Sequence, residues 1–314
     1  MNLKLKFIYL IFYTIIYHME ETKLKISVIT ASYNYEELIK ETIESVINQT
    51  YPHWELIIVD DGSNDNSVEV IKKYCKIDDR IKFFQHENGV NKGLKDTVLL
   101  GLEKASSEWV AFLESDDIFK LNCLEEKIKV IENNPETNFI FSDVEFFGDG
   151  EKIKNFEPYL WRKSELLKKR IEYTDLLEIN LIPTFSCVMI KKELFNNCDF
   201  NCEVPQWLDW FLWMQLLQKT KVTYIRKDLT LWRLHPQSYI NTTSEIKKIN
   251  FTRQLLKTLN NNIYMHSLID IYAFINKKRI EKFFRPQVQY LNNLILSCVS
   301  ANQLNNKFID IIKI

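Results

Sequence analysis

The chain has 314 residues, of which 46% are hydrophobic and 26% charged, and a formal net charge of −1. This size and composition are typical of a globular protein with a substantial core, and the near-zero charge argues against a nucleic-acid partner. The average conceals an asymmetry, because residues 241–314 carry eleven Lys or Arg against four Asp or Glu. Six cysteines without a CxxC pair favour a reducing, cytoplasmic compartment and argue against a zinc site.

An apolar run at residues 7–17 needs a separate interpretation. It is too short to span a membrane, and although it resembles the core of an export signal, no small-residue cleavage site follows it. Met19 opens a polar stretch, so translation from Met19 is one interpretation, and a peripheral membrane anchor or an export signal are the others. We therefore treat residues 1–23 as a leader that is either not translated or a short apolar anchor.

From residue 24 the apolar spacing alternates between the periods of strands and of helices. This alternation predicts an α/β fold with a doubly wound, mostly parallel sheet, in which ligands bind beyond the carboxyl ends of the strands. Strands are expected within 25–34, 54–61, 80–87 and 109–113, and helices within 35–51, 67–76 and 94–105.

The pattern becomes less regular beyond residue 120. We expect the chain beyond the leader to divide into residues 24–120, residues 121–241 and residues 242–314, the last of them a basic helical extension. The further expected elements are a helix at 123–133, a strand at 139–147, a charged and loosely helical segment at 151–178, a strand and helix start within 183–195, an aromatic helix at 204–219, and one or two strands within 221–235.

Two groups of carboxylates follow apolar strands. Asp60 and Asp61 follow one strand, and Glu114, Asp116 and Asp117 follow another. Carboxylates this close raise one another's pKa unless a cation lies between them, and Mg²⁺ or Mn²⁺ is commonly held by one or two carboxylates together with substrate phosphates. The alternatives are a turn for the first pair and a solvated strand end for the second group. Neither GxxxxGK[ST] nor GxGxxG is present, which argues against ATPase and dinucleotide-binding functions.

Four segments together resemble family 2 glycosyltransferases of the GT-A fold. The resemblance is strongest over residues 25–117 and continues more weakly to residue 241, and it implies that residues 24–120 form a nucleotide-sugar-binding half and residues 121–241 an acceptor-binding half. It implies an inverting, metal-dependent hexosyltransferase that moves one sugar from a nucleotide sugar, with a UDP-sugar favoured, to a glycan or lipid-linked acceptor in surface polysaccharide or lipopolysaccharide assembly. The segments are ISVITASYN (26–34), SVINQTY (45–51), WELIIVDDGSNDNS (54–67) and SEWVAFLESDD (107–117).

The resemblance also implies donor-binding residues. Ala31 and Tyr33 would line the nucleobase pocket, with Tyr33 stacking on the base, while Asp61 would bind the base and Asp60 would support it. This sequence lacks the arginine that the family carries at the start of the helix after the third strand. Lys92 and Lys95 are the nearest substitutes, and we assign Lys95 to donor binding.

The same resemblance implies a site for Mn²⁺ or Mg²⁺. Asp116 would face the ribose or the metal, and Asp117 would bind the divalent ion that bridges the diphosphate. His235, in RLHPQS, would be a further metal ligand and Arg233 a phosphate contact. The alternative for His235 is a purely structural role.

Asp209, in WLDWFLWMQLL, matches the catalytic aspartate of the family, although Leu208 replaces the glutamate that usually precedes it. The neighbouring tryptophans are expected to desolvate Asp209 and raise its pKa, which suits a general base. The alternatives are a helix-capping aspartate and tryptophans that serve only as core.

Two wider hypotheses remain open from the sequence. Leu208 and the missing arginine also suit a non-catalytic nucleotide-sugar or glycan-binding protein of the same fold. The basic extension suits peripheral attachment to the inner face of the cytoplasmic membrane, and a solvated extension or dimer contact is the alternative.

Overall fold

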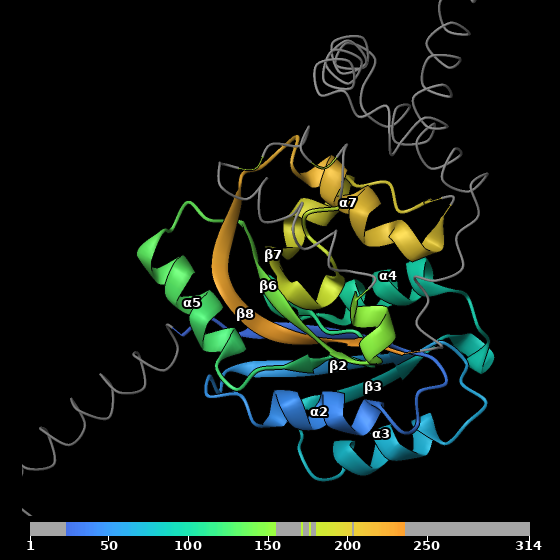
Figure 1. The fold of residues 1–314 in the computed structure, drawn as a ribbon. Helices are drawn as coiled ribbons and strands as arrows, with labels where there is room; N and C mark the ends of the chain where they lie inside the picture. Colours follow the sequence, from blue (N-terminus) through green and yellow to red (C-terminus); the bar gives the residue numbers. More distant parts are fainter. Residues whose placement is uncertain (1–22, 155–170, 172–175, 177–179, 203, 236–314) are drawn as a thin grey trace, which may run out of the picture. The chain divides into compact units, whose positions relative to one another are not determined.

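A computed structural model describes residues 23–154, 171, 176, 180–202 and 204–235 (Figure 1). The leader at 1–22, most of the predicted segment 151–178 and everything from 236 onward, including the predicted basic helical extension, lie outside the described residues. The described residues belong to two compact units. The first contains 23–154, 182–198 and 219–235, and the second contains 171, 176, 180–181 and 199–218 without residue 203.

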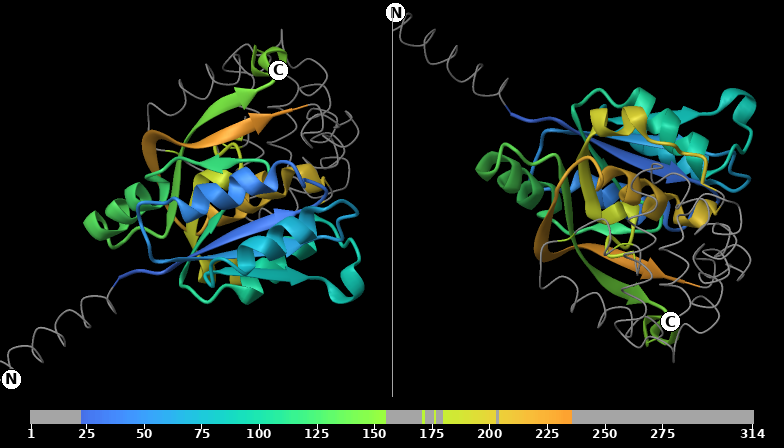
Figure 2. Two further views of the ribbon diagram at one scale, coloured as in Figure 1. Left: turned by 90° about the horizontal axis from the view of Figure 1, so that it is seen from below. Right: turned by 90° about the horizontal axis from the view of Figure 1, so that it is seen from above.

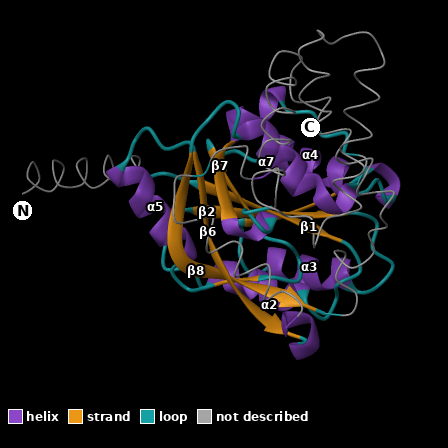
Figure 3. Ribbon diagram, turned by 45° about the horizontal axis from the view of Figure 1, so that its top comes forward, coloured by secondary structure: helices purple, strands orange, loops and turns teal. Residues whose placement is uncertain are grey.

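The first unit is built on one mixed sheet, whose strands are drawn in orange in Figure 3. The sheet has eight strands in the order β3-β2-β1-β4-β7-β6-β8-β5. β1 is parallel to both β2 and β4, β2 is parallel to β3, and β6 is parallel to β8, whereas β7 and β5 pair antiparallel to their neighbours. The predicted mostly parallel α/β sheet is therefore confirmed. The strands are β1 (Ile26–Ser32), β2 (Trp54–Asp60), β3 (Ile81–Gln85), β4 (Trp109–Phe112), β5 (Ile118–Phe119), β6 (Phe139–Gly148), β7 (Val188–Lys191) and β8 (Val222–Leu234).

Helices cover both faces of this sheet. α2 (Ile39–Ile47) and α3 (Ser67–Cys75) lie against one face, where the view from below in Figure 2 has them in front of the strands. α4 (Leu94–Lys104) packs on the other face so closely that a Cβ at Gly101 would lie 2.4 Å from the side chain of Ile29, so only glycine fits there. α5 (Cys123–Asn133) follows β5.

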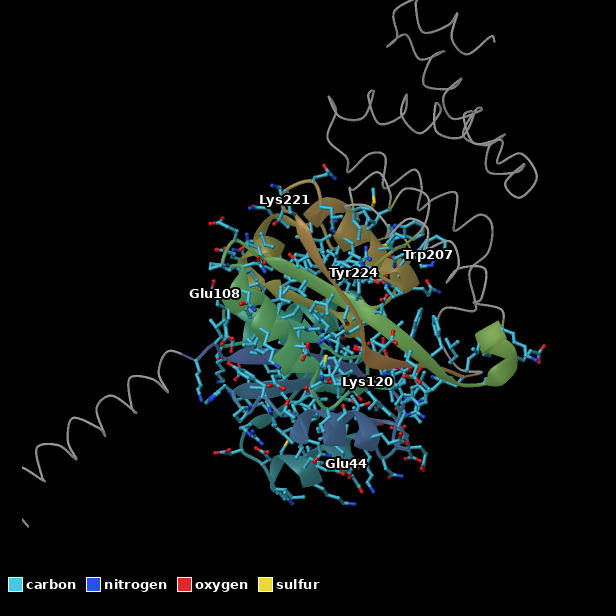
Figure 4. The ribbon with its side chains drawn as sticks, turned by 60° about the vertical axis from the view of Figure 1, so that its left-hand side comes forward. Glu44, Glu108, Lys120, Trp207, Lys221 and Tyr224 are labelled. Atoms are coloured by element: carbon cyan, nitrogen blue, oxygen red, sulfur yellow. The ribbon has the colours of Figure 1, made fainter. Side chains whose placement is uncertain are left out.

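Alternating residues of the inner strands supply the core. Ile26 and Val28 of β1 pack with Leu56 and Ile58 of β2 toward α2 and α3, because successive side chains of a strand point to opposite faces. A hydrogen bond of 2.6 Å from the Tyr74 hydroxyl to Glu44, which Figure 4 labels on α2, ties the two helices together.

One predicted element differs from the structure, and the structure decides between one and two strands for another. Within 183–195, β7 is followed by the 3-10 helix η4 (Lys192–Asn197) instead of an α-helix, and the 3-10 helix η3 (Phe185–Cys187) precedes β7. Residues 221–235 form the single strand β8 of 13 residues, whose pairing with β6 shifts register around Asp143. The shift bends one long strand where the sequence pattern allowed two.

Glu55, at the start of β2, is a buried charge with a structural role. Its carboxylate accepts hydrogen bonds from Lys82 Nζ (2.6 Å), Ser27 Oγ (2.6 Å) and the backbone amide of Ser106 (2.8 Å). Burial opposes ionisation of Glu55, but these hydrogen bonds outweigh it and hold its pKa well below the usual range. Glu55 thus fastens the amino ends of the strands, opposite the end where the carboxylate groups lie.

Across the described residues, no helix has both the length and the apolar character needed to cross a membrane.

Candidate active site

The predicted carboxylates lie where the parallel strands end. Ser32, at the end of β1, pairs with Asp60 at the end of β2, and Ile29 pairs with Phe112, the last residue of β4. The acid loop, residues 113–117, continues from β4, and its first amide donates to the carbonyl of Ile29 at 3.0 Å. The two carboxylate groups therefore follow β2 and β4, the strands on either side of β1, at the carboxyl ends of the parallel strands, as the sequence predicts.

A polar stripe on α2 fixes the acid loop and the residues that follow it. Thr42 Oγ1 lies 3.0 Å from the carbonyl oxygen of Ser115 and 2.9 Å from that of Asp117. Ser45 Oγ, on the same face of α2 as Thr42, accepts from the amide of Phe119. Gln49, two residues beyond the end of α2, contacts the backbone of Lys120 and Leu124 and extends these contacts.

A second element, the turn at 184–186, holds the loop from the other side. Ser186 Oγ donates to Asp117 Oδ2 at 2.5 Å and accepts from the amide of Glu114 at 2.9 Å, while Thr184 Oγ1 donates to the Glu114 carboxylate. Asp117 Oδ1 accepts from the backbone amide of Arg233 at 2.9 Å. Asp117 is fully buried, and burial together with the nearby carboxylates of Asp116 and Glu114 raises its pKa well above the usual value.

Asp116 is the more accessible of the two adjacent aspartates. Its Oδ2 lies 3.0 Å from His235 Nε2, and both side chains retain some exposed surface, 16% for Asp116 and 14% for His235. The ring of Tyr35 meets the imidazole edge-on, with 5.6 Å between ring centroids. Burial and the nearby carboxylates of Asp116 and Glu114 raise the pKa of Tyr35, so its hydroxyl keeps its proton and stays a hydrogen-bond donor.

Arg233 links α2 to the acid loop. Its Nε donates to the carbonyl of Asp116 at 2.8 Å, its Nη2 lies 2.8 Å from Glu41 Oε2, and its guanidinium lies 4.3 Å from the centroid of the Phe147 ring. The predicted phosphate contact of Arg233 stays a prediction.

Asp116 and His235 fit a divalent cation with few protein ligands. Among the described residues, no group of three or more His, Cys, Asp or Glu is arranged to hold a metal. A carboxylate and an imidazole nevertheless meet at Asp116 and His235, and Mg²⁺ or Mn²⁺ commonly takes its other ligands from substrate phosphates and water. Direct coordination of the cation by Asp117 stays a prediction. Two observations do not favour it: Asp117 is fully buried, and each of its carboxylate oxygens already accepts a hydrogen bond.

Ser186→Ala is expected to lower the free energy of unfolding by about 2 kcal/mol, because it leaves a buried carboxylate oxygen of Asp117 without its donor. Chemical denaturation of the full chain measures this change. Ser142→Ala is the matched control: this serine is also buried, but its hydroxyl makes only a 3.5 Å contact, with the Cys187 carbonyl, so we expect a loss below about 1 kcal/mol. Equal losses in the two variants would contradict the role of Ser186.

Asp60 and Asp61 fix two loops by accepting hydrogen bonds from backbone amides: Asp60 fixes the loop after β2, and Asp61 fixes the loop before α4. Asp60 accepts from the amides of Gly62 and Ser63, and Asp61 accepts from the amides of Lys92 (2.7 Å) and Gly93 (2.9 Å). Gly62 has a positive φ of 76°, and a Cβ there would lie 2.7 Å from backbone atoms of the facing loop, so this position requires glycine. A role of Asp61 in base binding stays a prediction.

Three further residues predicted to bind the nucleotide-sugar donor belong to β1, the loop after it and α4. Tyr33 is 43% exposed and directly follows β1, which suits a stacking surface, and Ala31 is half-buried near the end of that strand. Lys95 lies in the first turn of α4, with its Nζ 3.4 Å from Asp96 Oδ1. Their contacts with a donor stay predictions.

The second unit contains the predicted base. Asp209 is the second residue of α7 (Leu208–Leu216) and is 9% exposed; Asn180 Nδ2 donates to its Oδ2 at 3.0 Å. Burial raises the pKa of Asp209 to about 7, although hydrogen bonds from the Trp210 amide and from Asn180 act in the opposite direction. Leu208, in the position of the family's glutamate, is 1% exposed and belongs to the core.

Two tryptophans flank Asp209 in the sequence. Trp207, which Figure 4 labels, belongs to the 3-10 helix η5 (Pro205–Trp207). Trp207 and Trp210 are both half-buried, with ring centroids 5.8 Å apart and an interplanar angle of 64°. Trp210 Nε1 donates to the carbonyl of Leu176 at 2.8 Å, which fixes the ring. Because both residues are only half-buried, they retain some exposed surface beside Asp209 in the sequence.

The mixed α/β sheet is of the GT-A type, the fold shared by the solved structures described below. The family model "Glycosyl transferase family 2" matches residues 27–198, more than half of the chain. The chain belongs to glycosyl transferase family 2, a family of sugar-transferring enzymes.

Relatives and solved structures agree with this assignment. An uncharacterized glycosyltransferase of Rickettsia bellii is 31% identical over 278 residues, covering 88% of this chain but 35% of that protein, so this chain spans about a third of that relative. TuaG of Bacillus subtilis, assigned to teichuronic acid biosynthesis, is 33% identical over 208 residues (66% of this chain, 77% of TuaG). The Escherichia coli UDP-Glc:alpha-D-GlcNAc-diphosphoundecaprenol beta-1,3-glucosyltransferase WfgD is 30% identical over 200 residues (64% and 72%).

Two solved structures share the fold. S. aureus TarS 1–349 in complex with UDP-GlcNAc has a TM-score of 0.63 at 18% identity, covering 87% of this chain and 81% of that chain. The mannosyltransferase PcManGT of Pyrobaculum calidifontis, in complex with GDP-Man and Mn²⁺, has a TM-score of 0.52 at 13% identity, covering 88% and 87%. At these identities the likeness shows the fold alone.

Several residues near the candidate site escape detection from sequence. Thr184 and Ser186 lie about seventy residues from the carboxylates they contact. Asn180 precedes Asp209 by 29 residues. Tyr35 follows the resembling ASYN segment, but nothing in its spacing indicates contact with His235. The one usable signal is the polar pair Thr184 and Ser186 within an apolar run.

Proposed function

We propose that this chain is an inverting, metal-dependent hexosyltransferase that moves one sugar from a UDP-sugar to a glycan or lipid-linked acceptor. The observation that carries the proposal is the pairing of Asp116 with His235 at the carboxyl ends of the parallel strands in a member of this family. WfgD, whose name states a UDP-Glc donor and a diphosphoundecaprenol acceptor, supports the choice of donor and acceptor. We further propose a role in surface polysaccharide assembly at the inner face of the cytoplasmic membrane, where such an acceptor would be presented.

Asp116 and His235 would hold Mn²⁺ or Mg²⁺. A divalent cation bound there supplies positive charge that stabilises the departing diphosphate. Asp117 would help to position His235, because its carboxylate accepts a hydrogen bond from the backbone amide of Arg233, two residues before His235. Tyr35 would limit the orientations of the imidazole and offer its hydroxyl as a donor to the bound nucleotide sugar.

Asp209 would be the general base. Its carboxylate takes the proton of an acceptor hydroxyl, and the acceptor oxygen bonds to the anomeric carbon while the bond from that carbon to the diphosphate oxygen breaks. UDP leaves with the electron pair of the broken bond, and a single displacement inverts the anomeric configuration. A carboxylate whose pKa is about 7 is a stronger base than an exposed aspartate and is still ionised in part at neutral pH.

The pH dependence of transfer follows from this assignment. Because the base must be ionised, kcat/KM is expected to rise about tenfold per pH unit below pH 7 and to level off above it. Initial rates of UDP release between about pH 5.5 and 8.5, at constant ionic strength, measure the profile. A profile that stays flat across this range would contradict an Asp209 base.

Thermal unfolding with a nucleotide panel tests the donor assignment. The full chain is heated with UDP, GDP, dTDP or CMP, each with Mn²⁺ and then with EDTA. UDP at about one hundred times its dissociation constant is expected to add ~2.7 kcal/mol of stability, and EDTA is expected to remove most of this gain. Stabilisation by UDP without any release of UDP from UDP-sugars would instead favour a non-catalytic binding protein, the alternative that the apolar Leu208 suggests.

A further inference from the structure

The side chain of Asn180 contacts the carboxylate of Asp209. Its Nδ2 donates to Asp209 Oδ2 at 3.0 Å in a partly buried environment within the second unit. The two residues are 29 positions apart in the sequence, so the contact depends on the tertiary fold.

A buried base faces two opposing requirements. Burial favours the protonated carboxyl group, whereas a base must be ionised before it accepts a proton. A hydrogen bond donated to a carboxylate oxygen favours the ionised form. Among the described residues, the pKa of Asp209 is shifted by burial, by backbone amides and by the Asn180 side chain, and none of these causes is a charged group. Among the side chains that the structure describes, Asn180 therefore supplies the hydrogen bond that favours the ionised form of Asp209.

The chemistry of an amide suits this task. A lysine or arginine at the same place would lower the basicity of the carboxylate strongly, because an opposite charge within about 4–6 Å shifts a carboxyl pKa by 1–3 units. A neutral amide gives a smaller shift and leaves the carboxylate basic. Leu208, which precedes Asp209, is buried and has no polar side-chain atom, so it offers no such support.

We propose that Asn180 is a positioning residue for the general base: its side-chain amide holds Oδ2 of Asp209 in one orientation and favours the ionised carboxylate. This inference rests on the proposed function of Asp209 and adds a residue that the family resemblance does not indicate.

Asn180→Leu tests the proposal, because leucine has a similar size but no donor. The probe reaction is UDP release from UDP-glucose by the full chain with Mn²⁺, with GlcNAc-diphosphoundecaprenol as acceptor, followed across pH. The midpoint of the kcat profile is expected to move up by about one pH unit, so that the rate falls about tenfold near pH 6 and recovers to within about twofold near pH 9. In Asn180→Ser, which keeps a hydroxyl donor, the midpoint is expected to stay close to that of the unaltered chain.

Asn201→Leu is the matched control. Asn201 Nδ2 donates to Asp199 Oδ1 at 2.9 Å, so this variant removes an amide–carboxylate bond of the same kind within the same unit. We expect its pH profile to match that of the unaltered chain. A rate loss in Asn180→Leu that is equal at every pH would indicate a merely structural role and would overturn the proposal.

Infrared difference spectroscopy separates this proposal from the proposed function. The carboxyl signal of Asp209, identified by its absence from Asp209→Asn, is titrated in the unaltered chain and in Asn180→Leu. A midpoint that rises by about one unit in Asn180→Leu supports the proposal, and an unchanged midpoint overturns it. If Asp209→Asn still transfers sugar, the base assignment fails and the proposal fails with it, whatever the infrared midpoint.

Discussion

Asp209→Asn is expected to lower the rate of sugar transfer by about 10³-fold, with donor affinity unchanged within about twofold. Asparagine has nearly the shape of aspartate but cannot accept the acceptor's proton. The loss is therefore expected in kcat and in kcat/KM, while the nucleotide keeps its own contacts in the first unit. Initial rates with UDP-glucose, together with calorimetric titration of UDP, measure both quantities.

Asp199→Asn provides the matched control for this prediction. Asp199 belongs to the same unit and accepts hydrogen bonds from Asn201, so its replacement removes a carboxylate of the second unit without touching the candidate base. We expect transfer within about twofold of the unaltered chain, as is usual for surface substitutions. If Asp209→Asn were to retain a rate within a few-fold of that control, another group would have to serve as the base.

Asp116→Ala is expected to weaken UDP binding in the presence of Mn²⁺ by about a hundredfold, to the level that the unaltered chain shows in EDTA. The carboxylate is one of two side chains that would hold the cation, and its loss leaves His235 without its 3.0 Å partner. Because the cation would mediate the effect, EDTA is expected to cause little further loss in this variant. Titration calorimetry with UDP, with and without Mn²⁺, measures all four affinities.

The control for Asp116→Ala is Asp228→Ala, which removes an exposed carboxylate of β8 from the same unit. Its affinity for UDP with Mn²⁺ is expected to stay within about twofold of the unaltered chain. The metal assignment would be wrong if Asp116→Ala kept a metal-dependent gain in UDP affinity equal to that of this control.

Local patterns predicted most of the first unit. The apolar runs 56–59 and 109–113 predict β2 and β4, because a strand covered by helices on both faces is apolar along most of its length. The carboxyl ends of parallel strands lie on the same side of the sheet, so the placement of both carboxylate groups on that side could be predicted as well. The 3-10 helix η4 did not follow, because tertiary packing decides it. The pattern at 221–235 allowed one or two strands, and long-range pairing with β6 makes it the single strand β8.

The candidate site was only partly predictable. Asp116, His235 and Asp209 were identified from a resemblance in motif order, and the structure adds the 3.0 Å pairing of the first two. It also distinguishes Asp116 from the fully buried Asp117, which a run of three acids within four residues does not. Partners such as Ser186 and Asn180 are brought in by the fold, and no local spacing encodes them.

Transfer of glucose from UDP-glucose to GlcNAc-diphosphoundecaprenol, followed by proton NMR with Mn²⁺ and with EDTA, tests the central claim most directly. The account predicts a product whose anomeric configuration is opposite to that of the donor, with UDP released in equal amount, and no product in EDTA. Tight, Mn²⁺-dependent binding of UDP without any transferred sugar from UDP-glucose or UDP-GlcNAc, or a product that retains the donor's configuration, would contradict it.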